Sequence, residues 1–445
     1  MNTTTSSPAS TAMAPSAERV PGRRWRIGGL LGVGVLVNYF DRLSLSVAAP
    51  QIQAEFHLSP EQIGFFLSAF FWTYALLQVP AGMLLDRYGP TRIGRWGAFA
   101  WGIASTLTAL AGGWGGIFVA RMLLGIAEAP GFMVSSKATG YWFPRGERAL
   151  ATAIFDAAAK FSNVIGVPLV AFVVVGFGWR WGFGICAALS FAYFFAFLAI
   201  YRDPSQDEKL TAAERRYIVE GGAAPEGAPA GGTSGMLGYL LRQRKVWGLM
   251  LGFAAYGYSF YLFLTWLPGY LVQTMHMSII KSAGFAAIPW MVATLTDLFV
   301  GGWLIDHLIA KGHAESKVRK AVLVCGMVMG LAVFGATQTT DPVWAIVWIS
   351  IALGGLAAAA PVGWSLPSLI APKGGVGTVG GLMNFGNNLM GAAAPIATGL
   401  IVGATGSFVN AFLLAGAILL VGILAFVFLM GRIEPIAEPD MRSGG

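Results

Sequence analysis

The sequence predicts an all-α membrane protein with twelve transmembrane helices, arranged in two halves of six, and with both termini in the cytoplasm. Hydrophobic residues make up 56% of the 445 residues and charged residues only 11%, whereas a soluble domain carries about 25% charged residues. Apolar runs of about 20 residues, long enough to cross a bilayer, recur along the whole chain. They begin near residues 27, 62, 93, 117, 150, 181, 246, 284, 321, 343, 376 and 408.

Basic residues set the predicted orientation. The net charge of +8 would indicate a nucleic-acid partner only if the basic residues clustered on one folded face, and here they are spread over the loops. With the amino terminus inside, most of the 29 Lys and Arg residues lie in cytoplasmic loops. Arg180 and Lys281 lie outside, and Arg42, Arg121 and Lys160 lie within helices. Cytoplasmic loops are enriched in Lys and Arg, so we expect a membrane orientation and no nucleic-acid partner.

One long loop divides the chain. We predict a disordered cytoplasmic tail over residues 1–24, six-helix bundles over 25–202 and 246–432, the central loop over 203–245, and a second cytoplasmic tail over 433–445. The apolar run after the first tail is too long for a signal peptide, so we expect no cleavage there.

The central loop carries two local signals. Thr211-Ala-Ala-Glu214 has the spacing of a capping box, which predicts a short surface helix through Ile218. Residues 221–235 are mostly Gly, Ala and Pro, as in a flexible linker. The two halves also share a faint repeat, because Gly and Asp have the same spacing in 82–87 and in 302–307.

The loop after the second span contains a motif of Gly82, Leu84, Asp86, Arg87, Gly89 and Arg92. This motif resembles the cytoplasmic signature of the major facilitator superfamily, apart from Thr91, where a second basic residue is usual. With twelve spans and a central loop, the match extends over nearly the whole chain. It implies that Asp86 and Arg87 act in a gate that holds the halves together in the outward-facing state; the alternative is a role in topology alone.

Four segments carry a narrower resemblance: Asn38-Tyr39-Phe40-Asp41-Arg42, Arg121 to Pro130, Thr265-Trp266-Leu267-Pro268 and Met383 to Asn388. They resemble the anion:cation symporter family, whose bacterial members carry hexuronates, aldonates, aldarates and related organic acids together with protons. The resemblance implies that Arg42 binds the substrate carboxylate and that Glu128 and Asp41 carry protons.

Ionisable residues inside the predicted spans are candidates for function by physical reasoning alone. A charge at the bilayer centre costs at least ~2.5–3.5 kcal/mol on insertion scales, so each such residue needs a partner or water. These residues are Asp41, Arg42, Arg121, Glu128, Asp156, Lys160 and Asp297.

Two ion pairs are predicted between the first and fourth spans. Asp41 and Arg42 are adjacent, so their side chains diverge by about 100° on a helix, while Arg121 and Glu128 lie seven residues apart on one stripe. If these spans pack together, Arg42 reaches Glu128 and Asp41 reaches Arg121. The pairs either serve transport or merely lock the bundle.

We hypothesise that Glu128 and the substrate compete for Arg42. An ionised Glu128 occupies the guanidinium; after protonation from outside it releases Arg42, whose planar fork then binds a carboxylate bidentately. Loading both proton and anion neutralises the site, and Arg121 completes the proton-coupling set.

Asp156 and Lys160 are spaced i, i+4 and are expected to pair with each other. The simplest interpretation is a neutralised packing pair; if Lys160 instead faces the cavity, it can hold a second carboxylate and favour a diacid. Asp297 has no obvious local partner and is either a third proton-coupling site or reaches water past Thr294 and Thr296.

Uncharged polar residues complete the predicted pocket. Asn384 and Asn388 share one face of the eleventh span, with Asn387 beside them, and amides suit the hydroxyls of a polyol acid, although membrane amides also join helices. Tyr256, Tyr258 and Tyr261 are equally compatible with packing. Further candidate substrate contacts are Asn38, Tyr39, Tyr74, Gln78, Ser365 and Ser368.

Other classes of function are disfavoured. The G-x-G-x-x-G match at 375–380 follows no strand, and there is no Walker-type Gly-Lys-Ser/Thr, so we expect neither a nucleotide cofactor nor ATP-driven transport. The His residues lack metal spacing, and no helix pairs a Ser or Cys nucleophile with a His base. We therefore expect no metal, no cofactor and no enzyme activity.

The sequence predicts a monomeric secondary transporter in the bacterial inner membrane that takes up a small organic anion, most simply a sugar acid, together with protons. The alternatives are a carrier of a dicarboxylate or aromatic acid, or a facilitator or antiporter that uses the same site.

Overall fold

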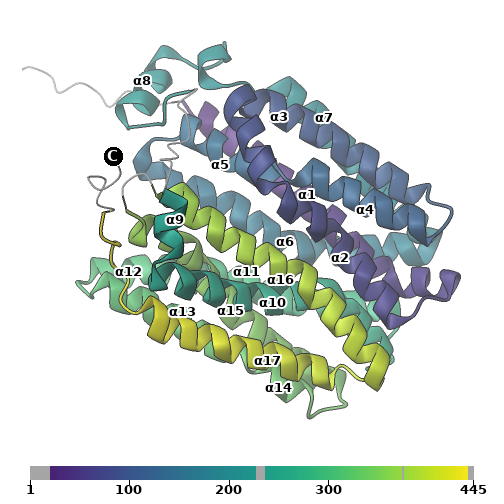
Figure 1. The fold of residues 1–445 in the computed structure, drawn as a ribbon. Coiled ribbons are helices and arrows are strands. Elements are labelled where there is room, and N and C mark those ends of the chain that lie inside the picture. Colours follow the sequence, from purple (N-terminus) through teal and green to yellow (C-terminus); the bar gives the residue numbers. More distant parts are fainter. Residues whose placement is uncertain (1–20, 227–235, 373–374, 439–445) are drawn as a thin grey trace, which may run out of the picture.

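A computed structural model describes residues 21–226, 236–372 and 375–438. Every regular element in these ranges is helical (Figure 1). The predicted tails and linker fall partly on residues 1–20, 227–235 and 439–445, which lie outside the described residues.

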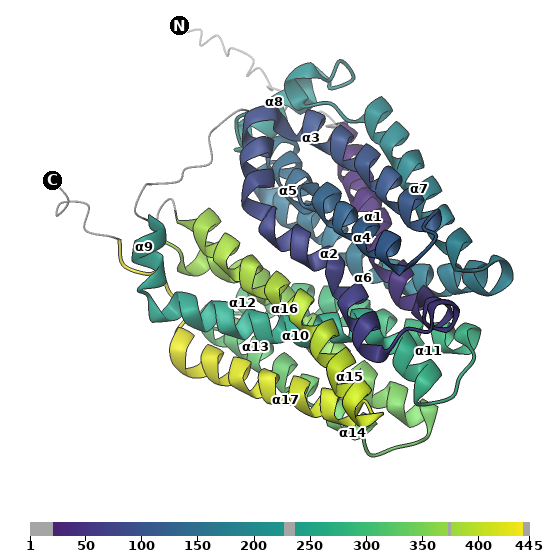
Figure 2. The ribbon, with the colours of Figure 1, turned by 45° about the vertical axis from the view of Figure 1, so that its right-hand side comes forward.

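Two bundles lie side by side (Figure 2). The amino-terminal bundle contains α1 (Arg23–Phe56), α2 (Pro60–Leu76), α3 (Gln78–Ala109), α4 (Trp114–Glu128), α5 (Gly131–Trp142), α6 (Arg145–Phe177) and α7 (Trp179–Ile200). The carboxy-terminal bundle contains α10 (Arg244–Gln273), α11 (Ile279–Thr296), the π-helix η2 (Asp297–Leu304), α12 (Ile305–Ala310), α13 (Glu315–Gly330), α14 (Val333–Ala336), α15 (Pro342–Ile370), α16 (Val376–Thr405), α17 (Val409–Leu424) and the π-helix η3 (Ala425–Met430). Between them lie the 3₁₀-helix η1 (Pro204–Gln206), α8 (Ala212–Glu220) and α9 (Met236–Leu241).

Judged by length and composition alone, the described helices give fewer candidate membrane spans than the twelve that the sequence predicts. Within the described residues, 10 helices are long and apolar enough to cross a membrane, and a bent pair brings the number to 11. This pair, Pro60–Leu76 and Pro80–Ala109, bends by 66° and covers the second and third predicted spans. Gly89 interrupts its second part with φ 77° and ψ 166°, a conformation that favours glycine. The exact number of twelve stays a prediction.

The helices α1 and α10 form the centre of the molecule. Both are buried along most of their length, as expected for a helix that is surrounded by others. Across the two bundles, α1 packs against α10, α2 against α16, and α6 against α11.

The bundles approach most closely at the end that carries the turn between α1 and α2. A Cβ at Gly64 of α2 would lie 2.6 Å from the carbonyl oxygen of Pro395 in α16. At the same end, Gln273 Nε2 donates to Gln53 Oε1 at 3.2 Å. We call this the α1–α2 end, and the opposite end, with α8 and α9, the loop end.

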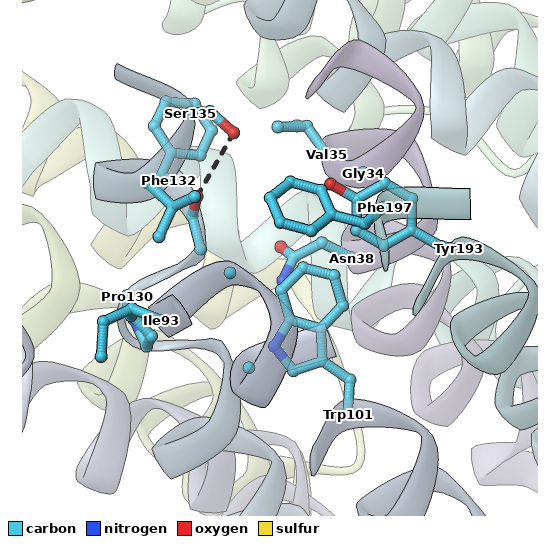
Figure 3. Close-up of a pocket in the computed structure, with 14 residues that line it drawn as sticks. Gly34, Val35, Asn38, Ile93, Trp101, Pro130, Phe132, Ser135, Tyr193 and Phe197 are labelled. Atoms are coloured by element: carbon cyan, nitrogen blue, oxygen red, sulfur yellow. Dashed lines mark hydrogen bonds between the residues drawn. The ribbon is translucent and has the colours of Figure 1, made fainter. Parts of the chain in front are cut away.

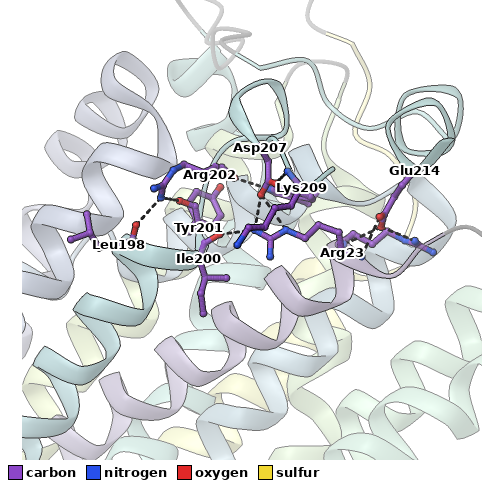
Figure 4. A network of polar contacts seen from close by, with 10 residues as sticks. Arg23, Leu198, Ile200, Tyr201, Arg202, Asp207, Lys209 and Glu214 are labelled. Atoms are coloured by element: carbon purple, nitrogen blue, oxygen red, sulfur yellow. Dashed lines mark hydrogen bonds and ion pairs between the residues drawn. The ribbon is translucent and has the colours of Figure 1, made fainter. Parts of the chain in front are cut away.

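At the loop end, hydrogen bonds join the segment that contains α8 to the start of α1 (Figure 4). Arg23 Nη2 donates to Asp207 Oδ2 at 2.7 Å and to the carbonyl oxygen of Ile200 at 2.8 Å. The helix predicted from Thr211 is present, and Thr211 caps it by accepting from the Glu214 N–H at 3.3 Å. The reciprocal half of the capping box is replaced, because the Glu214 carboxylate accepts from the N–H of Arg23 at 3.1 Å.

Candidate functional site

A cavity of about 150 Å³ lies between the two bundles. Its lining is aromatic, amide and charged, with side chains from α1, α2, α3, α5, α6, α10, α15 and α16. The residues are Tyr39, Arg42, Tyr74, Gln78, Phe132, Met133, Ser136, Asp156, Ala159, Lys160, Tyr256, Phe260, Tyr261, Trp364, Asn384, Asn387 and Asn388.

The Arg42 guanidinium is held on one side only. Its Nε donates to Glu128 Oε2 at 3.0 Å, and both side chains are buried. The rings of Tyr39, Phe70 and Tyr74 surround it, with centroids 4.9, 4.7 and 4.7 Å from Cζ. Neither terminal nitrogen of Arg42 hydrogen-bonds to any residue in the described part of the chain. The pair predicted from sequence is present, and the terminal edge of the guanidinium is available to a ligand.

Close packing of α4 on α2 brings Glu128 to Arg42. A Cβ at Gly125 would collide with the carbonyl oxygen of Phe70, so glycine permits the approach, and Thr73 Oγ1 ties the helices by donating to the Met122 carbonyl oxygen at 2.7 Å. Since Glu128 is the last residue of α4, its carboxylate reaches past α2 toward α1.

The predicted ion pair between Asp41 and Arg121 is wrong. The Asp41 carboxylate accepts from Ser105 Oγ of α3 and from Ser190 Oγ of α7, the latter at 2.9 Å. Arg121 Nη1 donates instead to the main-chain carbonyl oxygen of Asp41 at 2.8 Å. Both charged side chains are buried and lie outside the cavity lining. The hydroxyls satisfy the carboxylate from the side that faces away from α4.

Lys160 contacts two carboxylates. Its Nζ donates to Asp156 Oδ2 at 2.9 Å, the i, i+4 pair that the spacing predicts, and lies 3.2 Å from Asp297 Oδ1. Asp297 therefore has a partner, which lies in the other bundle and not in its own helix. Asp156 and Lys160 line the cavity, whereas Asp297 lies behind them.

Two predicted substrate contacts lie elsewhere. Asn38 faces a separate cavity of about 20 Å³ within the amino-terminal bundle, beside Trp101 and Tyr193 (Figure 3). Ser365 accepts from Arg319 Nη1 at 3.1 Å and donates to the Val362 carbonyl oxygen. Each is one residue away from a cavity residue, Tyr39 or Trp364, and one residue rotates a side chain by about 100° around a helix.

The other predicted contacts line the cavity, except Ser368, whose hydroxyl donates to the Ser365 carbonyl oxygen. The structure adds several further lining residues. Tyr256 and Tyr261 line it, whereas Tyr258 does not. Asn387 faces it as well as Asn384 and Asn388. Tyr256 and Phe260 are spaced i, i+4, which places them on one face of α10. The spacing alone does not show whether that face lines a cavity or packs against another helix. Residues that the sequence did not indicate are Phe132, Met133, Ser136, Ala159, Phe260 and Trp364.

Comparison with known proteins identifies the family. Residues 31–395 match the family model described as Major Facilitator Superfamily. The chain belongs to the Major Facilitator Superfamily. It is therefore a multi-pass membrane transporter and not an enzyme.

Relatives within the superfamily are bacterial. The transporter YybO of Bacillus subtilis is 41% identical over 425 residues, which cover 95% of this chain and 98% of that protein. A probable galactarate/D-glucarate transporter, GudP of Escherichia coli, is 32% identical and covers 95% and 97%. A D-galactonate transporter of Escherichia coli is 29% identical and covers 94% and 98%. These relatives agree with the resemblance to sugar-acid carriers and indicate the bacterial inner membrane.

A solved superfamily structure shares the fold. The bacterial homologue of the human lysosomal transporter Spinster, in an inward-facing and occupied conformation, superposes with a TM-score of 0.68 at 18% identity and covers 92% of this chain and 94% of that one.

Two charged residues of the superfamily signature contact side chains of their own bundle in this conformation. Asp86 forms an ion pair with Lys137 of α5, and the Arg87 guanidinium lies 5.2 Å from the ring centroid of Tyr88. Gly89 reverses the chain direction beside them. The predicted gate contact between the bundles belongs to the outward-facing state and stays a prediction.

Proposed function

We propose that this protein is a proton-coupled symporter that takes up a sugar acid by alternating access. The observation that carries the proposal is the arrangement of Arg42, whose Nε binds Glu128 while its terminal nitrogens, beside the cavity, form no hydrogen bond with the residues that the structure describes. A planar fork of this kind binds a carboxylate through two parallel hydrogen bonds.

Charge balance links the proton to the anion. Arg42 and Glu128 are neutral as a pair, so a carboxylate that binds Arg42 leaves one uncompensated negative charge in a buried site. An uncompensated buried charge is costly. A proton on Glu128 restores neutrality and also weakens its hold on Arg42. The loaded Arg42–Glu128 site is then neutral when the carrier changes conformation, and a half-loaded carrier stalls.

Asp41 is proposed as a second proton-binding residue. It is fully buried one residue from Arg42, and two serine hydroxyls hold it. Hydroxyls can reverse their role and accept from a protonated carboxyl group, so Asp41 can be satisfied in both protonation states. Arg121 donates to the main-chain carbonyl oxygen of Asp41 and so positions this segment of α1.

The uncharged lining suits a polyhydroxy acid. Asn384, Asn387 and Asn388 offer both donors and acceptors, and aromatic rings can cover the C–H faces of a sugar chain. The named sugar-acid relatives support the same class of cargo.

The contacts between the bundles suggest an inward-facing state. If the loop end is cytoplasmic, as its basic residues predict, then the close approach of Gly64 to Pro395 and the Gln53–Gln273 hydrogen bond close the outer side. We propose that the bundles rock about the central cavity and open this end to admit the anion.

Uptake by the Glu128→Gln variant in proteoliposomes tests the coupling. A pH gradient, acidic outside, should drive accumulation of radiolabelled gluconate by the wild type but not by Glu128→Gln, while counterflow exchange of gluconate persists in the variant. Glu55→Gln is the matched control, because Glu55 pairs with Arg180 at the surface, and it should behave as the wild type. Gradient-driven accumulation that survives in Glu128→Gln would refute the coupling role.

A further inference from the structure

The cavity has two cationic poles with unequal compensation. At the first, Arg42 faces one carboxylate, that of Glu128. At the second, the Lys160 ammonium contacts two carboxylates, those of Asp156 at 2.9 Å and Asp297 at 3.2 Å. The first pole is neutral and the second carries one excess negative charge when all its acids are ionised.

Among the described residues, no further cation balances the second pole, because the ion pairs of Asp156 and Asp297 are with Lys160 alone. The helix α15 packs against η2 beside Asp297 and has no ionisable side chain along Pro342–Ile370. The titratable side chains of α1 and α10 that line the cavity are Arg42, which pairs with Glu128, and the phenols of Tyr39, Tyr256 and Tyr261. A second cargo carboxylate that approached Lys160 would meet two acids already in place, and like charges brought together without solvent cost several kcal/mol.

The second pole can nevertheless accept hydrogen bonds from cargo. Asp156 Oδ2 is engaged by Lys160, while Oδ1 accepts no hydrogen bond from the described residues and the side chain lines the cavity. An ionised carboxylate oxygen is an acceptor only, so Asp156 Oδ1 matches a hydroxyl donor but not a second carboxylate.

We propose that Asp156, oriented by Lys160, binds the hydroxyl groups of the cargo at the end away from its carboxylate, and that the Asp156–Lys160–Asp297 triad rejects cargo with a second carboxylate there. The inference rests on the proposed function and narrows its substrate class to polyhydroxy monocarboxylates. It replaces the expectation that Lys160 holds a second carboxylate.

Two pairs of six-carbon acids test the triad. D-gluconate and D-glucarate differ only at C6, which is a hydroxymethyl group in one and a carboxylate in the other; D-galactonate and galactarate form a second such pair. Calorimetric titration of the purified full chain should give affinities at least ~10-fold higher for the monoacid of each pair, because the diacid meets the uncompensated acids.

Two variants separate the parts of the triad. Asp156→Asn removes the charged acceptor, so the monoacid should bind more weakly. The preference for the monoacid over the diacid of the same pair should fall at least ~10-fold. Asp297→Asn leaves the cavity lining unchanged and makes the pole neutral, so the diacid should bind more tightly while the monoacid affinity is retained. Glu55→Gln is the control for folding and should keep the wild-type ratio.

The outcomes distinguish this inference from the proposed function. Two results overturn the role of the triad: a wild type that prefers the diacids, or a ratio of monoacid to diacid affinity that is unchanged in both Asp156→Asn and Asp297→Asn. Either result leaves the proposed transport of organic acids intact. A wild type that binds none of the four acids overturns the proposed function and the triad together.

Discussion

Arg42 donates to Glu128 through Nε at 3.0 Å, so the carboxylate occupies the side of the guanidinium and not its terminal edge. This geometry refines the competition that the sequence suggested. Cargo can bind the terminal nitrogens without first displacing Glu128, and the competition then concerns charge more than space. Since both residues are buried, we ascribe the proposed coupling of the proton to the anion to this charge cost.

Arg42→Lys should lose ligand binding although it keeps the positive charge. A lysine ammonium cannot form the two parallel hydrogen bonds of a guanidinium, so gluconate affinity should fall at least ~10-fold, equivalent to about 1.4 kcal/mol. Thermal-shift titration measures this loss, because ligand stabilisation follows concentration relative to Kd. Equal stabilisation of wild type and Arg42→Lys by gluconate would contradict the proposed contact.

Gly64→Leu should open the α1–α2 end. The new side chain would collide with the Pro395 carbonyl oxygen and force α2 away from α16. The readout is the disulfide yield between Gln53→Cys and Gln273→Cys, whose native amides hydrogen-bond, in a chain with Cys186 and Cys325 replaced by Ser. The yield should fall at least twofold in Gly64→Leu. Gly284→Leu is the control, since a Cβ at Gly284 meets nothing within 4 Å; an equal yield in both would show that the close approach does not hold this end shut.

The contribution of Glu147 to the stability of the loop end should be lost at acidic pH. Hydrogen bonds from the Arg24 side chain, at 2.6 and 2.9 Å, lower the pKa of Glu147 below its usual range. A lowered folded-state pKa contributes stability above the unfolded value of ~4.3, and this stability is lost as the pH falls through the folded value. Glu147→Gln should therefore melt about 2 °C below the wild type at neutral pH and together with it near pH 3. A difference that persists unchanged near pH 3 would argue against this ion pair.

The depth of functional residues in the membrane was predictable, but their rotation around each helix was not. Apolar runs place Tyr39 and Asn38 at the same depth in α1, yet only Tyr39 faces the cavity. In α15 the sequence favoured Ser365, whereas its neighbour Trp364 lines the cavity. A helix that is apolar on all sides has no periodic signal to orient it, so a polar residue alone is an ambiguous guide.

Partners distant in the chain were predictable only where few choices existed. Arg42 and Glu128 were paired correctly because buried charges need opposite charges. The same reasoning failed for Asp41, because serine hydroxyls of α3 and α7 satisfy its carboxylate, and serines are too common to indicate such a contact. The Lys160–Asp297 contact depends on the packing of α6 against η2, which no local pattern indicates.

Proton uptake on binding measures the central claim most directly. Calorimetric titration of gluconate into purified protein, in two buffers of different ionisation enthalpy, yields the number of protons taken up per bound anion. The account predicts that the wild type takes up about one proton more than Glu128→Gln. Equal proton uptake by the two proteins, with gluconate bound to both, would contradict it.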